Sequence, residues 1–351
     1  MTKSGKVFKG RGAGFNPLNR FEKIEFEIAE EEIGNLEKPK TQFYKDISKS
    51  ILTYNDSPDT GFEVGINPYR GCEHGCIYCY ARPTHEFLGL SAGIDFETQI
   101  FVKENAPELL RKELGKKKWK PQTVAISGNT DCYQPAEKHF ELTRNCLEVL
   151  LEFRNPVGII TKNHLITRDI DILKEFSSIN AVLAVISVTT LDPKLAGLME
   201  PRTSRPYLRL RTIEELTEAG IPVMVLVAPV IPGLTDHEIP EIIRSTVDAG
   251  ANRAAYVMLR LPYAVSDLFT EWIETHYPNR KNKILNRIRS VRKGKLNSAE
   301  FGKRMTGEGI FAKQVKDIFK LACKKYGLSN EKLLLSTEHF RNPDDKQQKL
   351  F

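Results

Sequence analysis

The sequence predicts an α/β protein in which parallel strands alternate with helices. Six apolar runs of strand length recur along the middle of the chain, and most are rich in Val and Ile and nearly continuous in apolarity. Buried parallel strands have this composition because both faces of their sheet are covered. The runs are FEVGIN (62–67), TVAISG (123–128), VGIITK (157–162), AVLAVISVTT (181–190), PVMVLVAPVI (222–231) and AAYVMLRL (254–261).

Segments with helical spacing follow the first five of these strands, so right-handed crossovers should join neighbouring strands. The helix after the fourth strand should end at Gly220, a residue suited to a C-cap. In the helix after the fifth strand, Thr235 and Glu238 have the spacing of a capping box and Gly250 closes the helix. The helical segments are APELLRKELG (106–115), AEKHFELTRNCLEVLLEF (136–153), RDIDILKEFSS (168–178), YLRLRTIEELTEAG (207–220) and TDHEIPEIIRSTVDAG (235–250).

Periodicity allows two arrangements of these six units, a barrel or an open, doubly wound sheet. Six units are fewer than the eight of a complete barrel. In both arrangements the loops that follow the strands should hold the functional site. We predict a core of residues 56–275, an N-terminal extension of residues 1–55 and a basic helical C-terminal extension of residues 276–351.

Nothing in the chain predicts export or a membrane span. The start, MTKSGKVFKGRGAGFNP, lacks the apolar stretch of a secretory signal, and no run approaches eighteen apolar residues. We therefore expect a cytoplasmic protein. In a reducing compartment, clustered cysteines are more often metal ligands or catalytic groups than disulfides.

Three of the six cysteines lie within eight positions, spaced Cys72-x3-Cys76-x2-Cys79, in the loop after the first predicted strand. A structural zinc site needs four ligands and usually shows two CxxC pairs, and this chain has no second pair. His74 or His85 could supply a fourth ligand, although both are more often ordinary loop residues. On a [4Fe–4S] cluster, three thiolates would leave one iron open, which is the mark of a reactive site.

With Tyr78 just before the third cysteine, this spacing resembles the signature of the radical S-adenosylmethionine enzymes. The resemblance implies a partial (β/α)6 TIM-like barrel that carries one [4Fe–4S] cluster on the three cysteines. In that family the amino and carboxylate groups of S-adenosylmethionine chelate the unique iron. One-electron cleavage gives methionine and a 5′-deoxyadenosyl radical, which takes a hydrogen atom from a substrate C–H bond. The protein holds the cofactors close and excludes water.

The resemblance also implies cofactor contacts at the ends of later strands. The segment after the second strand would bind the methionine amino group, and Lys162 after the third would pair with its carboxylate. Residues of the fourth strand would bond ribose or carboxylate, and Ala228 of the fifth would lie against adenine, where Gly233 permits a close turn. Helix caps, turns, surface charge and simple packing are the ordinary alternatives. The predicted contacts are Tyr78, Gly128, Asn129, Thr130, Asp131, Lys162, Ser187, Thr189 and Ala228.

Within the superfamily, roughly residues 60–265 most resemble the spore photoproduct lyase group, also described as DNA repair photolyase-like. The shared features are tyrosines on both sides of the third cysteine, the Thr130–Asp131 pair and the lysine after the third strand. In the lyase, a cysteine at the start of the segment after the second strand returns a hydrogen atom to the substrate radical. Gly128 stands at that position here, so we do not expect the same repair by the same route.

Three further residues are candidates for catalysis. Cys132 could replace the missing hydrogen donor, or could be a small buried apolar side chain. Tyr80 could relay a hydrogen atom, or could pack over the cluster. Arg202 and Glu200 follow the fourth strand, where an Arg–carboxylate pair could fix a substrate phosphate or carboxylate, or could shape the loop.

The net charge of +7 is concentrated in few places. Residues 280–295 contain eight Lys and Arg and no acidic residue, and residues 116–120 place Trp119 among four lysines. Such runs can follow a phosphate backbone and stack a base, or can be solvated surface. From the family resemblance and residues 280–295 we expect nucleic acid as the substrate class. The chemistry that the resemblance implies needs a reductant, and we expect a flavodoxin or ferredoxin as the electron donor. The alternatives are radical modification of a protein, peptide or small metabolite, a non-catalytic Fe–S sensor, and a zinc-stabilised nucleic-acid-binding module.

Overall fold

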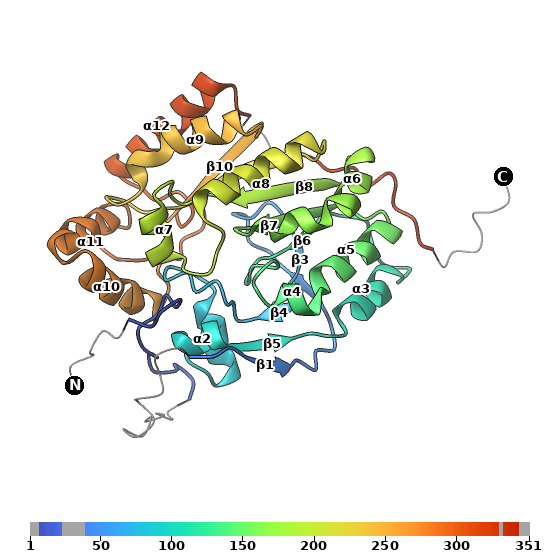
Figure 1. Ribbon diagram of the computed structural model, residues 1–351, viewed down its shortest axis with the longest axis horizontal. Coiled ribbons are helices and arrows are strands. Elements are labelled where there is room, and N and C mark those ends of the chain that lie inside the picture. Colours follow the sequence, from blue (N-terminus) through green and yellow to red (C-terminus); the bar gives the residue numbers. More distant parts are fainter. Residues whose placement is uncertain (1–6, 23–38, 330–332, 344–351) are drawn as a thin grey trace.

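The computed structural model describes residues 7–22, 39–329 and 333–343 (Figure 1). Its largest sheet has seven strands in the order β10-β9-β8-β7-β6-β3-β2. Only β2 runs antiparallel to its neighbour, so six parallel strands stand side by side in chain order. This arrangement confirms the predicted α/β class and partial barrel. The strands are β2 (Leu52–Tyr54), β3 (Val64–Ile66), β6 (Val124–Ile126), β7 (Val157–Thr161), β8 (Val182–Ser187), β9 (Val223–Val230) and β10 (Arg253–Met258).

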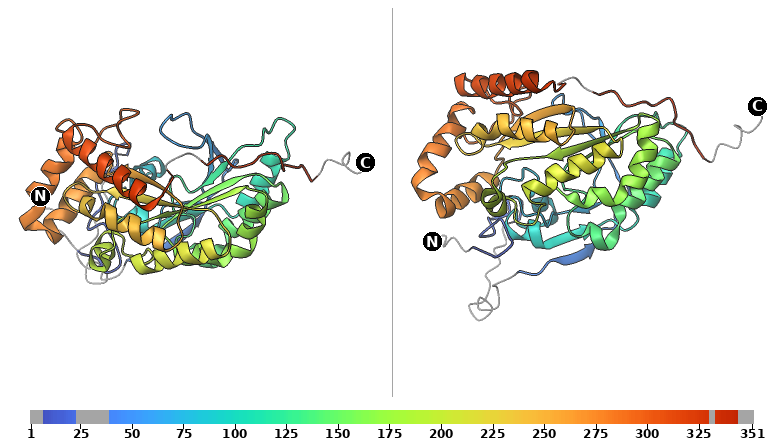
Figure 2. Two further views of the ribbon diagram at one scale, coloured as in Figure 1. Left: turned by 90° about the horizontal axis from the view of Figure 1, so that it is seen from above. Right: turned by 45° about the horizontal axis from the view of Figure 1, so that its top comes forward.

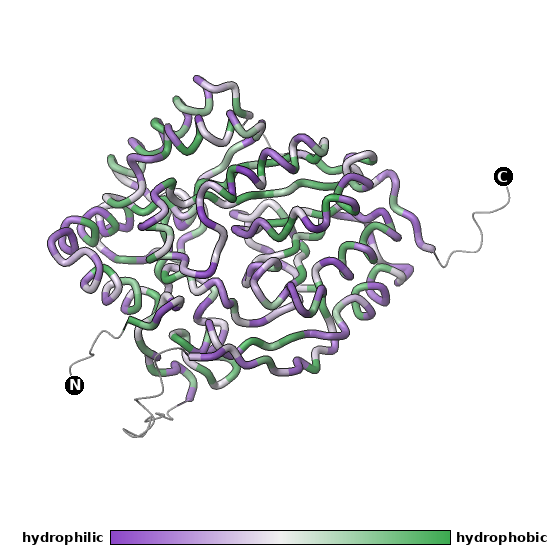
Figure 3. Tube along the Cα trace, viewed as in Figure 1, coloured by the Kyte–Doolittle hydropathy of each residue, from purple (hydrophilic) through white to green (hydrophobic). Residues whose placement is uncertain are grey.

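Helices between the strands cover one face of this sheet (Figure 2), and apolar residues concentrate along the strands beneath them (Figure 3). Leu147, Leu173 and Ile213 of these helices are buried against strand residues. None of the helices in the described residues combines the length and apolar composition that crossing a bilayer requires. The covering helices are α3 (Ala106–Leu114), α5 (Leu142–Glu152), α6 (Ile170–Ser178), α8 (Pro206–Glu218) and α9 (Ile239–Asp248), and α12 (Ile310–Tyr326) packs against α9.

Further helices complete the loops and the C-terminal part. Three of them, α10, η4 and α11, follow β10 in direct succession and pack against one another. Their bounds are α4 (Glu137–Phe140), η2 (His164–Asp169), α7 (Pro193–Met199), η3 (Asp236–Glu238), α10 (Val265–His276), η4 (Pro278–Arg280) and α11 (Lys281–Ser290).

Two helix predictions need correction. The helix expected over 136–153 is divided into α4 and α5, because Glu141 between them has left-handed backbone (φ 50°). The capping box at Thr235 and Glu238 is wrong. The Thr235 hydroxyl accepts from the backbone N–H of Ile231 at 2.9 Å, while the Glu238 carboxylate accepts from the loop after β8. Tertiary bonds therefore replace the local cap.

A second sheet of three strands stands beside the first and was not predicted. Its strands are β1 (Gln42–Lys45), β5 (Gln99–Val102) and β4 (Tyr69–Arg70), with β1 parallel and β4 antiparallel to β5. Between β4 and β5 the chain forms the cysteine loop, then η1 (Arg82–Leu88) and α2 (Ile94–Thr98). The small sheet therefore fixes the two ends of the segment that contains the three cysteines.

The N-terminal segment, residues 7–22, packs directly on this cysteine loop. The buried carboxylate of Glu97 accepts from the backbone N–H groups of Gly12 and Ala13 at 3.0 and 2.8 Å, and pairs with buried Arg82 at 2.5 Å. A Cβ atom at Gly12 would lie 1.8 Å from the carbonyl oxygen of Gly75. Only glycine fits there, so a segment far away in sequence forms part of the wall of the loop.

We predict that Glu97→Ala lowers the free energy of unfolding by about 3–5 kcal/mol, because it leaves the buried Arg82 guanidinium without its counter-charge. Denaturant unfolding monitored by circular dichroism measures this loss. Glu241→Ala, which removes a partner of Arg244 on the exposed face of α9, is the control and should change the unfolding midpoint little. Equal losses in the two variants would contradict a structural role for the buried pair.

Burial lowers the pKa of His85 to about 4. Its Nε2 lies 2.9 Å from the carbonyl oxygen of Gln99, and within the described part of the chain its Nδ1 has no hydrogen-bond partner. A proton on Nδ1 would therefore be buried without an acceptor.

As pH falls from about 6.5 towards 4, the unfolded chain binds a proton at His85 that the folded chain does not. His85 should therefore contribute a loss of stability over this window, of up to about 3 kcal/mol. His85→Gln should flatten the pH dependence of the unfolding midpoint, whereas His139→Gln at an exposed position should not. Parallel pH profiles for wild type and His85→Gln would refute this assignment.

Candidate active site

The cysteine loop is a compact turn held by backbone bonds. Cys72 and Cys76 are buried and Cys79 is partly buried. The N–H of Cys79 donates to the carbonyl oxygen of Cys76 at 3.1 Å, and that oxygen also accepts from Arg82 Nε at 3.0 Å. The N–H of Ile77 donates to the carbonyl oxygen of Met199 at 3.0 Å. The loop is thereby attached to the end of α7 (Pro193–Met199).

The surroundings of the three thiols suit an iron–sulfur cluster. Burial raises the pKa of each thiol, and the interaction of Cys72 with the other two sulfurs raises its pKa further. Cations oppose this effect: Arg82 lowers the pKa of Cys79, and Lys162 lowers that of Cys76. A thiolate is the form that binds metal.

In the described residues no three His, Cys, Asp or Glu side chains converge tightly enough to hold a single metal ion. Thiolates beside cations are the donor chemistry that iron–sulfur clusters use. Whether Cys72, Cys76 and Cys79 ligate such a cluster stays a prediction.

A buried carboxylate, Glu200, joins this loop to the ends of the strands. It accepts hydrogen bonds from the Tyr78 hydroxyl and from the Thr189 hydroxyl, the latter at 2.7 Å. It pairs with Arg209 and lies 3.7 Å from Lys162 Nζ. We call these five residues the Glu200 cluster. It brings together a residue of the cysteine loop with residues after β7 and β8 and from α8.

Ala228 of β9 extends the same network. Its carbonyl oxygen accepts from Lys162 Nζ at 3.0 Å and from the Thr189 hydroxyl at 2.7 Å. Four of the nine predicted cofactor contacts therefore lie together in space, because the carboxyl ends of parallel strands meet at one edge of the sheet. They are Tyr78, Lys162, Thr189 and Ala228.

The Glu200 cluster has an excess of positive charge. Burial raises the pKa of Glu200, and the Arg209 guanidinium opposes that increase. Burial and the proximity of Arg209 lower the pKa of Lys162 to about 8. One buried carboxylate thus faces two cations, the buried Arg209 and the partly buried Lys162, so the excess charge favours a further anionic group beside Lys162.

Four of the remaining predicted contacts are on the loop after β6, where most polar groups already have partners, and the fifth, Ser187, ends β8. Asn67 Oδ1 accepts from the N–H groups of Gly128, Asn129 and Thr130 at 3.1, 3.0 and 3.4 Å. The Thr130 hydroxyl donates to the carbonyl oxygen of Tyr69 at 3.1 Å. Asn129 is exposed, and Gly128 is half-buried. Hydrogen bonds to Asn67 and Tyr69 therefore attach the loop after β6 to the residues that follow β3.

Asp131 ties the same loop to the next strand. Its carboxylate accepts from the Thr161 hydroxyl at 2.7 Å and from the Lys162 N–H at 2.8 Å, and its Oδ2 lies 3.3 Å from His74 Nδ1. These contacts lower the pKa of Asp131 although burial opposes the shift. Ser187 is also buried, and its carbonyl oxygen accepts from Arg209 at 3.1 Å. Both residues stay predicted contacts, with a structural role visible in addition.

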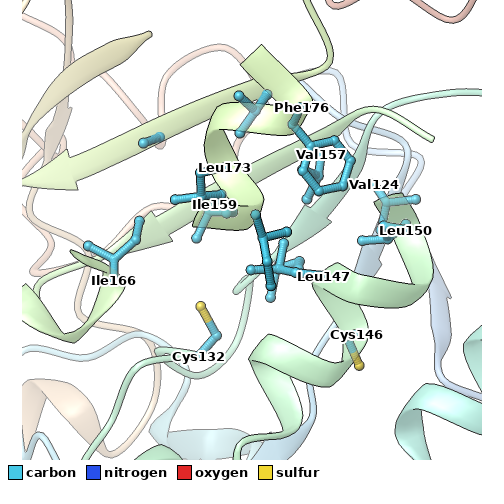
Figure 4. Close-up of a cluster of buried hydrophobic side chains, with 14 of the residues drawn as sticks. Val124, Cys132, Cys146, Leu147, Leu150, Val157, Ile159, Ile166, Leu173 and Phe176 are labelled. Atoms are coloured by element: carbon cyan, nitrogen blue, oxygen red, sulfur yellow. The ribbon is translucent and has the colours of Figure 1, made fainter. Parts of the chain in front are cut away.

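The structure supports the ordinary alternative for Cys132. Its side chain is fully buried in the hydrophobic core with Leu147 and Ile166 (Figure 4). Burial raises the pKa of its thiol. A thiol enclosed by the core is poorly placed to donate hydrogen to a substrate, so the donor interpretation has no geometric support.

The other two catalytic candidates also have defined partners. The Tyr80 hydroxyl donates to the carbonyl oxygen of Gly128. The possible Glu200–Arg202 pair is wrong, because Glu200 pairs with Arg209 and Arg202 lies 3.0 Å from Glu73. Arg202 is therefore paired with Glu73 of the cysteine loop and is not an unpaired cation in the site.

The two basic runs differ from simple polynucleotide surfaces. Trp119 is half-buried against the core, and its indole N–H donates to Asn155 at 3.1 Å, so it is not a free stacking platform. In the run 280–295, Arg292 is 2% exposed and donates to the carbonyl oxygens of Met258 and Leu259. Part of the positive charge of residues 280–295 is therefore buried and bonded within the protein, where it cannot contact a polynucleotide.

Sequence reasoning assigned no role to several residues that build the site. Arg82, Glu97, Arg209 and Asn67 are all buried or nearly so, and they hold the loops through bonds between distant parts of the chain. Arg209 stands at an inward position of α8, where an arginine among apolar neighbours such as Ile213 needs a buried partner. The inward position of Arg209 in α8 was therefore the sequence feature from which a buried ion pair could have been predicted.

Comparison with known proteins agrees with this geometry. The family model of the radical SAM superfamily, where SAM is S-adenosylmethionine, matches residues 66–246. An uncharacterized protein of Mycobacterium tuberculosis (strain ATCC 25618 / H37Rv) is 36% identical over 241 residues, which are 67% of this chain and 70% of the relative. An uncharacterized protein of Methanocaldococcus jannaschii is 33% identical over 190 residues, 54% of this chain and 69% of the relative.

Solved structures of spore photoproduct lyase share the fold. A cysteine-to-serine mutant of the lyase superposes with a TM-score of 0.62 at 17% identity, over 88% of this chain and 86% of the lyase. The lyase complexed with dinucleoside spore photoproduct gives a TM-score of 0.58 at 15% identity, over 82% and 80% of the two chains. The chain therefore belongs to the radical SAM superfamily, and it shares its fold with spore photoproduct lyase.

Proposed function

We propose that this protein is an enzyme that binds a [4Fe–4S] cluster through Cys72, Cys76 and Cys79 and cleaves S-adenosylmethionine to start hydrogen abstraction from a substrate C–H bond. The observation that carries the proposal is the meeting of the cysteine loop, through Tyr78, with Lys162 and Thr189 at the buried Glu200 carboxylate. This contact supports the proposal because it joins the cysteine loop to the strand ends at which the family resemblance implies S-adenosylmethionine contacts.

The reduced cluster and S-adenosylmethionine, when bound, would supply a 5′-deoxyadenosyl radical through one-electron cleavage of the sulfonium. Lys162 would attract the methionine carboxylate, because the Glu200 cluster holds one cation more than it has carboxylates. Tyr78 and Thr189 would hold the Glu200 carboxylate through their hydrogen bonds, and Glu200 would in turn keep the Lys162 ammonium in place. Ala228 would lie against adenine, with its carbonyl oxygen fixing the position of Lys162.

Nucleic acid is the substrate class that we propose. Spore photoproduct lyase, with which the chain shares its fold, has been solved with bound AdoMet and a dinucleoside spore photoproduct. Gly128 lies near the start of the segment after β6, at the position where the lyase group has its hydrogen-donating cysteine. A Cβ atom at Gly128 would meet other atoms only at 3.9 Å or beyond, so the space for a side chain exists while the thiol is missing. The fate of the substrate radical should therefore differ from that in the lyase.

The first test is production of 5′-deoxyadenosine. Reconstitution with iron and sulfide under anaerobic conditions, reduction with dithionite and addition of S-adenosylmethionine should yield 5′-deoxyadenosine that chromatography detects. The Cys72/Cys76/Cys79→Ala variant should yield none, because it lacks the predicted thiolate ligands. A fully loaded wild-type cluster that yields no nucleoside would favour an Fe–S sensor, and a colourless zinc-loaded protein would favour a zinc module.

A second prediction concerns Lys162. Lys162→Met should weaken S-adenosylmethionine binding by about tenfold or more, because a charge-assisted bond to the carboxylate is lost. Iron content should remain unchanged, since Lys162 is not a cluster ligand. Equilibrium dialysis with labelled S-adenosylmethionine measures the affinity, and Lys174→Met on the exposed face of α6 is the control. Undiminished affinity in Lys162→Met would exclude the predicted contact.

A further inference from the structure

Three arginines gather at the end of β10, close to the cysteine loop. Arg260 lies two residues beyond the strand, and its guanidinium is 5.2 Å from the ring centre of Tyr80, the residue after Cys79. Arg292 is buried beneath it and bonds the carbonyl oxygens of Met258 and Leu259. Arg304 completes the group: burial lowers the pKa of Arg260, and the charge of Arg304 lowers it further. We call Arg260, Arg292 and Arg304 the arginine cluster.

Positive charge exceeds negative charge around the arginine cluster. Asp59 is held by Arg304 at 2.7 Å and also accepts from the N–H of Gly302 at 2.8 Å. Glu308 lies nearest to Lys293, at 3.3 Å. Burial and Arg260 together lower the pKa of Arg292 to about 10, which shows that the positive charges act on one another. The cluster therefore carries more positive than negative charge, which favours the binding of an anion.

Arg260 also has unused hydrogen-bonding capacity. Its Nε is buried and, among the described residues, has no hydrogen-bond partner, and the same is true of Nε of Arg292, whose side chain is almost fully buried. Within the described part of the chain, Nη1 of Arg260 lies 3.7 Å from the sulfur of Met305, which is a weak acceptor. A buried guanidinium normally has its donors satisfied, so a ligand oxygen would complete this site.

Exposed aromatic rings adjoin the arginine cluster. Tyr80 is 48% exposed, and its hydroxyl donates to the carbonyl oxygen of Gly128. Phe301 is 55% exposed, and the guanidinium of Arg304 lies 4.4 Å from its ring centre. Flat exposed rings next to arginines are the arrangement on which proteins stack bases of single-stranded nucleic acid.

We propose that the arginine cluster, with Tyr80 and Phe301, is a nucleotide-binding subsite: Arg260 takes a phosphate and an aromatic ring stacks on the adjoining base. The proposal deepens the proposed function, on which it rests, by assigning the place where a polynucleotide substrate is held. The subsite begins one residue from Cys79, so a nucleotide bound there lies beside the site of radical formation. In this proposal Tyr80 and Phe301, and not Trp119, provide the surface on which a base stacks. Arg292 of the basic run contributes indirectly, because it bonds the backbone next to Arg260.

The test is equilibrium binding of fluorescent single-stranded oligothymidylate to the reconstituted protein with an oxidised cluster and no S-adenosylmethionine. Arg260→Gln should weaken binding about tenfold or more, and Arg260→Lys should restore part of the loss. Arg211→Gln on the exposed face of α8 is the matched control and should bind like wild type. Iron content and circular dichroism confirm that each variant is folded.

A second probe separates phosphate from base recognition. Tyr80→Leu and Phe301→Leu together should weaken oligothymidylate binding about fivefold or more and leave binding of an abasic oligonucleotide unchanged. Arg260→Gln should weaken both probes. Equal affinities of wild type and Arg260→Gln, or no binding of oligothymidylate to wild type, would overturn the subsite. Since the assay needs no radical chemistry, a failure here is distinguishable from a failure to form 5′-deoxyadenosine.

Discussion

The buried carboxylate of Glu200 is the constraint on which the arrangement of the site depends. A carboxylate without solvent must keep its cations and hydrogen-bond donors, because separating a buried pair costs about 3–5 kcal/mol. Its partners come from the cysteine loop, from the ends of β7 and β8 and from α8. One group thus fixes the distance between the predicted cluster ligands and the predicted cofactor contacts. The excess cation that remains, Lys162, makes the same place attractive to an anion.

Around Glu200, polar side chains bind each strand-end loop to the next. Asn67 after β3 bonds the loop after β6, and Asp131 of that loop bonds the end of β7. Asn163 after β7 accepts from the Ser204 hydroxyl at 3.3 Å and lies 3.1 Å from His74 of the cysteine loop. Loops held in this way are preorganised, which a site that must position a reactive species requires.

The sequence was sufficient for those features that depend on local pattern or on strand ends. Apolar runs predicted all six parallel strands, and the rule that strand ends meet at one edge predicted that Lys162, Thr189 and Ala228 would come together. Cysteine spacing carried the family assignment. The two glycines expected to end helices, Gly220 and Gly250, do have left-handed backbone.

Features that depend on pairing between distant residues could not be predicted. The small sheet, the packing of Gly12 on Gly75 and the Glu200–Arg209 pair all join parts of the chain whose proximity no local pattern encodes. For the same reason Trp119 looked like a stacking residue although its ring packs on the core. A basic run likewise gives no sign that Arg292 points inward. Nor does it indicate Arg260, outside the run, whose buried Nε has no hydrogen-bond partner among the described residues.

The most direct test of the central claim is the electron paramagnetic resonance spectrum of the reduced, reconstituted protein with and without S-adenosylmethionine. The account predicts a [4Fe–4S]+ signal whose g values change on addition of S-adenosylmethionine, because three cysteines leave one iron free to bind it. A [4Fe–4S]+ signal that S-adenosylmethionine leaves unchanged would contradict the account, since the cofactor would then not reach the cluster.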